Sequence, residues 1–522
     1  MDGKTIQILI AMIIYMAAVI GIGVVYAKRA NQNSEAYFLG GRSLGPWVTA
    51  MSAEASDMSG WLLMGLPGVA YWYGLADAFW TAFGLAVGTY LNWLLVSKRL
   101  RRYSVRANNS ITLPEFFSNR FRENKKTIMM IAAAFILIFF TVYASSCFVT
   151  CGKLFSTLFG ASYGSMMILG AVFVLLYTIL GGFLAESASD FMQAIVMIIA
   201  LTVIVAIGTV KAGGFGEVLA NAREIPGFLE FFGLASPTMT EAGEQLVEAG
   251  KPVFGAAAPY GILTVCSMMA WGLGYFGMPQ VLLRFMAIRK EDELKRSRRI
   301  AMVWVCISLA VAVFIGIVGR QLFPTAHLTK SAAENIFITL ATSSLPAILA
   351  GFVMAGILAA TISSSDSYLL IAASAFAKNI FQGVCKKDAT DKQVMLVTRV
   401  TLLVLTLIGV VIALDENSVI FQIVSFAWAG FGATFGPLML FSLFWKRTNK
   451  PGAIAGMVSG AAMVFLWKLV ISKLGGVFAI YELLPAFVVS SIVIVVVSLL
   501  TKAPSSQIEE DFEAVRTGKV EG

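Results

Sequence analysis

Apolar residues form long runs along almost the whole chain, and short polar connections separate these runs. Each run approaches the ~20 residues that an α-helix needs to cross a bilayer. The pattern predicts an all-α polytopic membrane protein with about thirteen transmembrane helices. The predicted spans are Ile6–Ala27, Pro46–Tyr71, Leu75–Ser97, Thr127–Leu158, Tyr163–Leu184, Phe191–Val210, Tyr260–Phe285, Met302–Phe323, Ile336–Phe376, Val394–Leu414, Ile420–Trp445, Gly452–Ile471 and Tyr481–Leu500.

Composition agrees with this pattern, and the placement of charge orients it. Hydrophobic residues make up 58% of the chain, more than the ~45–50% of soluble domains. The net charge of +9 comes from basic residues crowded into alternate connections, such as those from Lys98 to Lys126 and from Arg284 to Arg299. The connection from Lys211 to Phe254 is acid-rich instead. Basic connections face the cytoplasm, so an odd number of spans predicts an external N-terminus and a cytoplasmic C-terminus.

Signals for catalysis are weak. The segment GASYG (160–164) matches the G-x-S-x-G pattern of serine hydrolases, but that pattern requires a preceding strand and a histidine partner. Here it lies between two apolar runs, and the single histidine, His327, belongs to another connection. The five cysteines show neither a disulfide framework nor a zinc motif. The sequence predicts that the protein is not an enzyme.

One predicted span is interrupted by polar and small residues. The stretch SAEASDMSGWLLMGLPG, from Ser52 to Gly68, carries Asp57 and Gly60 inside an apolar run. A helix in lipid satisfies its own backbone, so such a span is either buried or locally unwound around a cavity. An ionisable residue at that depth indicates a functional site by default, although an interfacial position for Asp57 stays open.

A second span has the same character. The stretch SMMAWGLGYFGMPQVLLRF, from Ser267 to Phe285, is broken by three glycines and Pro279. Two interrupted helices at corresponding positions of two halves indicate an inverted-repeat transporter whose binding site lies at mid-membrane. The broken spans are the second and the seventh, so the pattern predicts a five-plus-five core, with one extra helix before it and two after it.

A third polar cluster lies in ILAATISSSDSYLL, from Ile357 to Leu370. One serine in a helix commonly bonds back to the helix, but this cluster has four serines and an aspartate in five residues. Ser363 and Ser367 share a face because they are four residues apart, and Ser364 lies beside it. These hydroxyls can meet carbonyls freed near Asp57 and form a neutral oxygen cage for Na⁺.

At these three stretches, and at SFAWAGFGATFGPLMLFSLFW further on, the chain resembles the sodium/solute symporter family over nearly its whole length. The resemblance implies a leucine-transporter-like fold with Na⁺ held between the second and ninth spans. The implied sodium ligands are the backbone oxygens of Ala55, Met58 and Ala360 and the hydroxyls of Ser363 and Ser364, with Asp57 shaping the site.

The resemblance also implies a solute site and two accessory acids. The implied solute contacts are Ser59, Gly60, Trp61, Tyr143, Trp271, Tyr275 and Pro279. Their aromatic faces suit a small zwitterion with an apolar ring, and Tyr143 alone could equally be a packing residue. Asp190 and Asp366 are possible accessory residues. Asp190 could instead cap a helix, and Asp366 departs from the family pattern.

The match of SDMSGW and WGLGYFGMP implies L-proline as the cargo of a bacterial plasma-membrane symporter, with Na⁺ as the coupling ion and no other cofactor. Relatives that carry pantothenate, carboxylates or sugars are the near alternative, since a fold does not choose its cargo. A channel is the distant one.

The expected organisation has six parts. They are residues 1–45, an extra helix and inner loop; 46–211, the first repeat; 212–255, an extracellular loop; 256–447, the second repeat; 448–501, two C-terminal helices; and 502–522, a solvated cytoplasmic tail.

Overall fold

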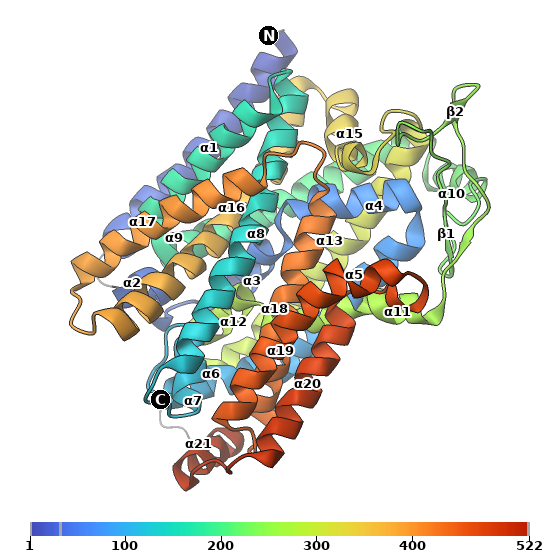
Figure 1. The fold of residues 1–522 in the computed structure, drawn as a ribbon. Helices are drawn as coiled ribbons and strands as arrows, with labels where there is room; N and C mark the ends of the chain where they lie inside the picture. Colours follow the sequence, from blue (N-terminus) through green and yellow to red (C-terminus); the bar gives the residue numbers. More distant parts are fainter. Residues whose placement is uncertain (1–2, 31–33, 519–522) are drawn as a thin grey trace.

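The computed structural model describes residues 3–30 and 34–518. They form a bundle of long helices in which α1 (Gly3–Ala30) begins at one end and α21 (Ser506–Thr517) lies at the other, as Figure 1 shows. Within the described residues, eleven helices are long and apolar enough to cross a membrane, or twelve if one bent pair is a single span. The expected all-α membrane architecture is confirmed.

The other helices follow in chain order. The first half has α2 (Ser34–Leu39), η1 (Gly40–Arg42), α3 (Pro46–Gly60), η2 (Trp61–Gly65), α4 (Leu66–Tyr73), α5 (Leu75–Leu91), η3 (Asn92–Val96), α6 (Ser97–Arg106), α7 (Leu113–Arg120), α8 (Thr127–Phe159), α9 (Tyr163–Lys211) and α10 (Phe215–Arg223). The second half has α11 (Ile262–Met269), η4 (Ala270–Gly277), α12 (Pro279–Ala287), η5 (Glu291–Glu293), α13 (Leu294–Leu322), α14 (Lys330–Ala333), α15 (Ile336–Ser344), α16 (Ala347–Ser374), η6 (Ala375–Cys385), α17 (Asp391–Ile412), α18 (Ile420–Phe444), α19 (Lys450–Leu469), η7 (Ile471–Leu474), η8 (Gly476–Phe478) and α20 (Leu483–Leu500).

The two interrupted spans are broken where the sequence predicts. In α3, Ser59 has φ 49° and ψ −170°, a left-handed conformation that interrupts the helical backbone. The predicted span 46–71 is therefore α3, η2 and α4 in succession, and it is absent from the eleven continuous helices. In the seventh span, Met278 is extended between η4 and α12, and the two parts meet at an angle of 43°. Pro279 stabilises the start of α12 because its fixed φ suits the first helical position.

Two predicted span boundaries differ from the structure. The chain reverses at Gly182, which has φ 58°, so Glu186 and Asp190 lie inside a helix and not in a connection. The hydroxyls of Tyr177 and Ser189 are 2.6 Å apart, whereas residues that far apart on a straight helix lie ~18 Å apart. The predicted span 336–376 is divided at Leu345 and Pro346 into α15 and the longer α16.

The acid-rich segment between α9 and α11 packs over one end of the bundle, here called the loop face. It contains α10 and two short antiparallel pairs, β1 (Gly233–Leu234) with β4 (Ala258–Pro259), and β2 (Val247–Glu248) with β3 (Lys251–Pro252). Gln245 accepts a hydrogen bond of 2.5 Å from the buried guanidinium of Arg320 in α13. This contact fixes the segment to the bundle.

The opposite end, here called the basic face, is formed by α6, α7 and α21. Asp511 of α21 accepts hydrogen bonds from Arg106 and Arg122, each at 2.8 Å, and Phe512 is buried beside them. The prediction of a fully solvated tail is wrong for this segment, because an apolar stripe of α21 packs on the bundle. Residues 519–522 lie outside the described part of the chain.

Candidate ion- and solute-binding site

The serine cluster of α16 meets α3 just before the break in that helix. Ser363 donates a hydrogen bond of 2.8 Å to the carbonyl of Ala55, and Ser364 donates one of 3.3 Å to the same oxygen. The Ser363 hydroxyl is also 3.2 Å from the carbonyl of Ala360. All four residues are fully buried. Two helices distant in sequence thus supply a compact group of neutral oxygens, which are the ligands that small hard cations take.

The break adds further backbone groups near this cluster. The amide of Trp61 donates to the carbonyls of Met58 and Ser59 and lies 3.2 Å from the Ser59 hydroxyl. The Met58 carbonyl thus accepts a hydrogen bond from a residue three positions on, at the break in the helix. Gly60 is tightly packed as well, because a Cβ there would lie 2.5 Å from the hydroxyl of Thr150 in α8.

The carboxylate of Asp57 faces the other broken span. It accepts a hydrogen bond of 2.8 Å from the Tyr275 hydroxyl and one of 3.1 Å from the Gln280 amide. The hydroxyls of Tyr143 and Tyr368 both lie 3.3 Å from the Asp57 carbonyl. Asp57 is 2% exposed, so it is buried in the protein and does not lie at the membrane–water interface. It connects α3 with the α11–α12 region.

The expected solute residues border one aromatic cluster. The rings of Trp61 and Trp271 are 5.5 Å apart, and Phe421 of α18 lies 5.8 Å and 5.2 Å from them. Tyr275 contacts Trp428 edge to face at 5.0 Å, while Tyr143 stacks on Tyr368 at 4.2 Å. Such aromatic faces offer apolar contact area together with attraction for a cation.

A cavity of about 360 Å³ leads from the loop face to this cluster. Its lining includes Trp72, Trp271, Glu334, Phe421 and Tyr481. Trp271 and Phe421 thus line the cavity and also contact Trp61 at the break in α3.

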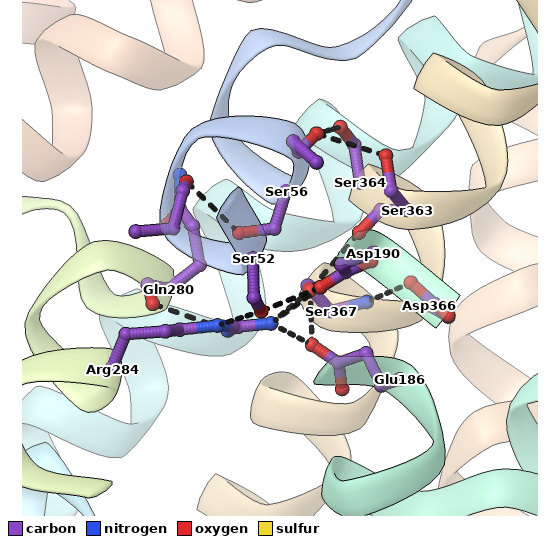
Figure 2. Close-up of polar contacts among 12 residues, drawn as sticks. Ser52, Ser56, Glu186, Asp190, Gln280, Arg284, Ser363, Ser364, Asp366 and Ser367 are labelled. Atoms are coloured by element: carbon purple, nitrogen blue, oxygen red, sulfur yellow. Dashed lines mark hydrogen bonds and ion pairs between the residues drawn. The ribbon is translucent and has the colours of Figure 1, made fainter. Parts of the chain in front are cut away.

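On the side of the basic face lies a buried ionic network, and Figure 2 shows the side chains of Arg284, Glu186, Asp190 and Ser367 pointing toward one another. Arg284 of α12 is fully buried and forms ion pairs with Glu186 and, at 3.3 Å, with Asp190. It also bonds the hydroxyls of Ser52, at 3.0 Å, and Ser367, at 2.9 Å. The sequence places Arg284 in a predicted span and also in a cytoplasmic connection. The second assignment is wrong, because Arg284 is buried in α12, where its carboxylate partners offset the cost of burying its charge.

The two possible accessory residues both belong to this region. Asp190 accepts a hydrogen bond of 2.7 Å from Ser52, and it lies within α9 and not at a helix cap. One Asp366 oxygen accepts a hydrogen bond of 2.8 Å from the Ser367 amide. The other Asp366 oxygen has no hydrogen-bond partner among the described residues.

Several residues of the site were not predicted from the sequence. They are Ser52, Glu186, Gln280, Arg284, Tyr368, Phe421 and Trp428. The available signal was the presence of Glu186 and Arg284 in or beside apolar runs, since charges at membrane depth are expensive and usually functional. The aromatic and amide residues gave no such signal, because these types are common in membrane helices.

Two broken helices in a membrane bundle, an oxygen cluster beside one break and a cavity that ends at the neighbouring aromatic residues define a secondary transporter of the alternating-access class. The model of the sodium:solute symporter family matches residues 37–460. The chain belongs to the sodium:solute symporter family.

Named relatives and solved structures agree with this assignment. The chain is 40% identical to the high-affinity proline transporter PutP of Bacillus subtilis (strain 168), over 93% of this chain and 97% of the relative. It is 38% identical to the sodium/proline symporter of Staphylococcus aureus (strain USA300 / TCH1516), over 98% and 96%. These relatives are transporters and not enzymes, in agreement with the sequence.

Among solved structures, the fold is similar to that of a Na⁺-coupled sialic acid symporter in a substrate-bound outward-open state. The TM-score is 0.75 at 17% identity, and the match covers 96% of this chain and 99% of that one. A structure of MhsT in complex with L-phenylalanine matches with a TM-score of 0.51 at 14% identity, over 87% and 97%. At these identities the likeness concerns the fold, which is the expected leucine-transporter-like one.

Proposed function

We propose that this protein is a symporter that couples inward movement of Na⁺ to uptake of L-proline by alternating access. The observation that carries the proposal is the convergence of the Ser363 and Ser364 hydroxyls on the Ala55 carbonyl. A hydroxyl can turn from donating to a carbonyl to accepting a cation, so the same oxygens suit a bound Na⁺. The names of the relatives support both the ion and the cargo.

The proposed sodium ligands are Ala55, Met58, Ala360, Ser363 and Ser364. Met58 completes the set when the backbone at the break turns its carbonyl inward. Asp57 supplies a buried negative charge next to these neutral groups, and it acts through the electrostatic potential and not as a ligand. Asp366 is proposed as an accessory acid because one of its oxygens has no partner among the described residues.

Proline is proposed to bind between the breaks, against Ser59, Gly60 and the aromatic rings. Its pyrrolidine ring suits the faces of Trp61 and Trp271, and its ammonium suits Tyr143 and Tyr275. Freed amides after Ser59 and the start of α12 at Pro279 suit the carboxylate, because helix N-termini favour negative charge.

The proposed orientation places the loop face outside and the basic face in the cytoplasm. The cavity above Trp271 then opens to the outside, and the Arg284 network closes the inner path. The ranges 46–211 and 256–447 are the proposed inverted repeats, because each begins with a broken span.

Uptake of labelled L-proline into proteoliposomes tests the function. We expect saturable uptake that requires an inward Na⁺ gradient, with unlabelled proline competing and pantothenate, short carboxylates and sugars not competing. Vesicles with K⁺ in place of Na⁺ are the control. Uptake independent of Na⁺, or competition by one of the other solutes in place of proline, contradicts the proposal.

A further inference from the structure

Gln280 contacts the proposed ion site with its side chain and the inner ionic network with its backbone. Its amide nitrogen donates a hydrogen bond of 3.1 Å to Asp57. Its carbonyl oxygen accepts a hydrogen bond of 3.1 Å from the guanidinium of Arg284. Gln280 is fully buried, and Figure 2 shows the dashed contact between Gln280 and the Arg284 guanidinium. One residue thus connects the proposed ion site with the ionic network around Arg284.

The two hydrogen bonds to the Asp57 carboxylate come from opposite sides of a hinge. Tyr275 lies in η4, before the extended residue Met278, and Gln280 lies in α12, after it. Since each donor uses a different carboxylate oxygen, the angle between η4 and α12 is fixed with respect to α3. Hinges of this kind are where transporters and other closing proteins absorb changes of conformation.

The residue that carries this carboxylate, Asp57, is close in sequence to two of the proposed ion ligands. Ala55 is two residues before Asp57 and Met58 is one residue after it. An ion that fixes these carbonyls also fixes the direction in which the Asp57 side chain leaves the helix. An ion can shift a conformational equilibrium only if it binds the two states with different affinity, and the geometry of α3 gives that difference.

We propose that Gln280 is a positioning residue that couples occupancy of the ion site to the angle of α12 and to closure of the Arg284 network. With the ion bound, Asp57 holds Tyr275 and Gln280, and α12 keeps Arg284 among its carboxylates. When the ion leaves, the clamp on the hinge loosens and α12 is free to move. This inference rests on the proposed function for the identity of the ion and the solute.

A purely structural role makes a different prediction. A buried amide needs hydrogen-bond partners, so loss of Gln280 would lower stability whatever its part in transport. A structural residue, however, would leave the mutual effect of ion and solute on each other's affinity unchanged. That mutual effect is reciprocal by thermodynamic necessity, and it is the quantity to measure.

The variant Gln280→Met removes the amide and keeps the length of the side chain. The half-saturating Na⁺ concentration for proline uptake into proteoliposomes is measured twice, at low and at saturating proline. The quantity compared between variants is the ratio of the value at low proline to the value at saturating proline. We expect this ratio to fall toward one in Gln280→Met, by about fivefold or more if the coupling is of typical size. Gln382→Met is the matched control, because the Gln382 amide also donates at 3.1 Å, but to the carbonyl of Ala389 outside the site.

A double-mutant cycle identifies the contact that is responsible. Gln280→Met, Asp57→Asn and the combined variant are compared by the same ratio. If the hydrogen bond between Gln280 and Asp57 carries the coupling, the ratio falls no further in the combined variant than in the more affected single variant. The effects of residues in contact are not additive. Additive losses, or a wild-type ratio in Gln280→Met, overturn the inference.

Hydrogen exchange gives a second readout that does not depend on the cargo. Exchange of the α12 amides is followed by mass spectrometry with Na⁺ and with K⁺. We expect Na⁺ to slow exchange in wild type and in Gln382→Met, and to have no such effect in Gln280→Met. Protection that persists in Gln280→Met contradicts this inference alone, whereas a wild-type protein without sodium-dependent proline uptake contradicts the proposed function.

Discussion

At the scale of residues, the proposed sodium site depends on the two hydroxyls beside Ala55. The side chains of Ser363 and Ser364 are neutral, so they leave the charge of a bound monovalent ion uncompensated. A carboxylate ligand would neutralise that charge. Ser363 is also held by its own helix, since it additionally bonds the carbonyl of Ala360. Neutral hard oxygens of this kind suit a small hard cation.

The first prediction concerns these hydroxyls. Ser363→Ala together with Ser364→Ala should raise the half-saturating Na⁺ concentration for proline uptake by about a hundredfold or more, because each of the two lost contacts to a charged group contributes ~1.5–3 kcal/mol. Proline selectivity should stay the same, which a competition panel checks. Ser374→Ala is the control, since this buried serine of the same helix bonds the carbonyl of Ile371, one turn back in its own helix and outside the proposed site. A changed choice of solute with an unchanged Na⁺ response would place these serines in the solute site.

At the scale of elements, α12 is a short helix with an unusually polar set of contacts. It carries Gln280 and Arg284 four residues apart, so both lie on the face that packs against α3. Arg284 also contacts α9 and α16 through its carboxylate and hydroxyl partners. Movement of α12 therefore requires the Arg284 network to separate.

The second prediction is that Arg284→Leu abolishes net transport and destabilises the protein. Removing one partner from a buried ion pair leaves charges without compensation and costs about 3–5 kcal/mol. Thermal unfolding in detergent and proline uptake measure the two effects. Arg289→Leu is the control, because the pair of Arg289 with Glu293 is largely exposed and such pairs contribute ~0–1 kcal/mol. Equal unfolding temperatures for the two variants would show that the Arg284 network does not stabilise this state.

The third prediction concerns pH at the loop face. His327 lies in the connection between α13 and α14, its ring nitrogen is 2.9 Å from the Thr339 hydroxyl, and burial, with the charge of Arg320 as a second cause, lowers its pKa to about 4. The folded state therefore binds fewer protons than the unfolded state, whose histidine pKa is ~6.5. This contribution to stability is complete above about pH 6.5 and decreases as the pH falls toward about 4.

The variant His327→Gln checks that prediction, because glutamine can still reach Thr339 but does not titrate. Between pH 7 and pH 4.5 the unfolding temperature of wild type should fall more than that of His327→Gln. Parallel curves for the two proteins would show that this histidine is equally easy to protonate in both states.

At the scale of the whole molecule, the arrangement predicts the energetics of the cycle. A cavity on the side of the loop face is lined by Trp271 and Phe421 of the aromatic cluster, while buried ion pairs of Arg284 lie on the side of the basic face. Access from one side at a time is what allows a gradient of one solute to drive another. A channel would need both sides open together, and the broken helices fit alternating access better.

The fourth prediction is that transport is electrogenic. If one Na⁺ enters with one neutral zwitterion, a potential of 100 mV, negative inside, contributes about 2.3 kcal/mol. A tenfold Na⁺ gradient adds about 1.4 kcal/mol, so the sum of about 3.7 kcal/mol sustains roughly 500-fold accumulation. Proteoliposomes with K⁺ and valinomycin set the potential. Uptake that does not respond to the sign of this potential, or that a proton gradient drives equally well without Na⁺, would exclude one-to-one sodium symport.

Much of this protein follows from its sequence alone. The length of the apolar runs predicts membrane helices because a bilayer core has a fixed thickness. Clusters of glycine, serine and proline predict the two breaks, because these residues weaken or end a helix wherever they occur. Asp57, Ser363 and Ser364 lie inside polar stretches that are visible in the local sequence, so the candidate ion site could be predicted without the tertiary structure.

Only the tertiary structure decided which residues face each other across the bundle. Arg284 and Glu186 are nearly 100 residues apart, and no local pattern tells a basic residue at the end of an apolar run whether it faces water or a buried carboxylate. The same holds for Gln280, whose role depends on Asp57 of another helix. Local sequence sets the backbone and its breaks, whereas burial and pairing of charges depend on packing between distant helices, which periodicity does not record.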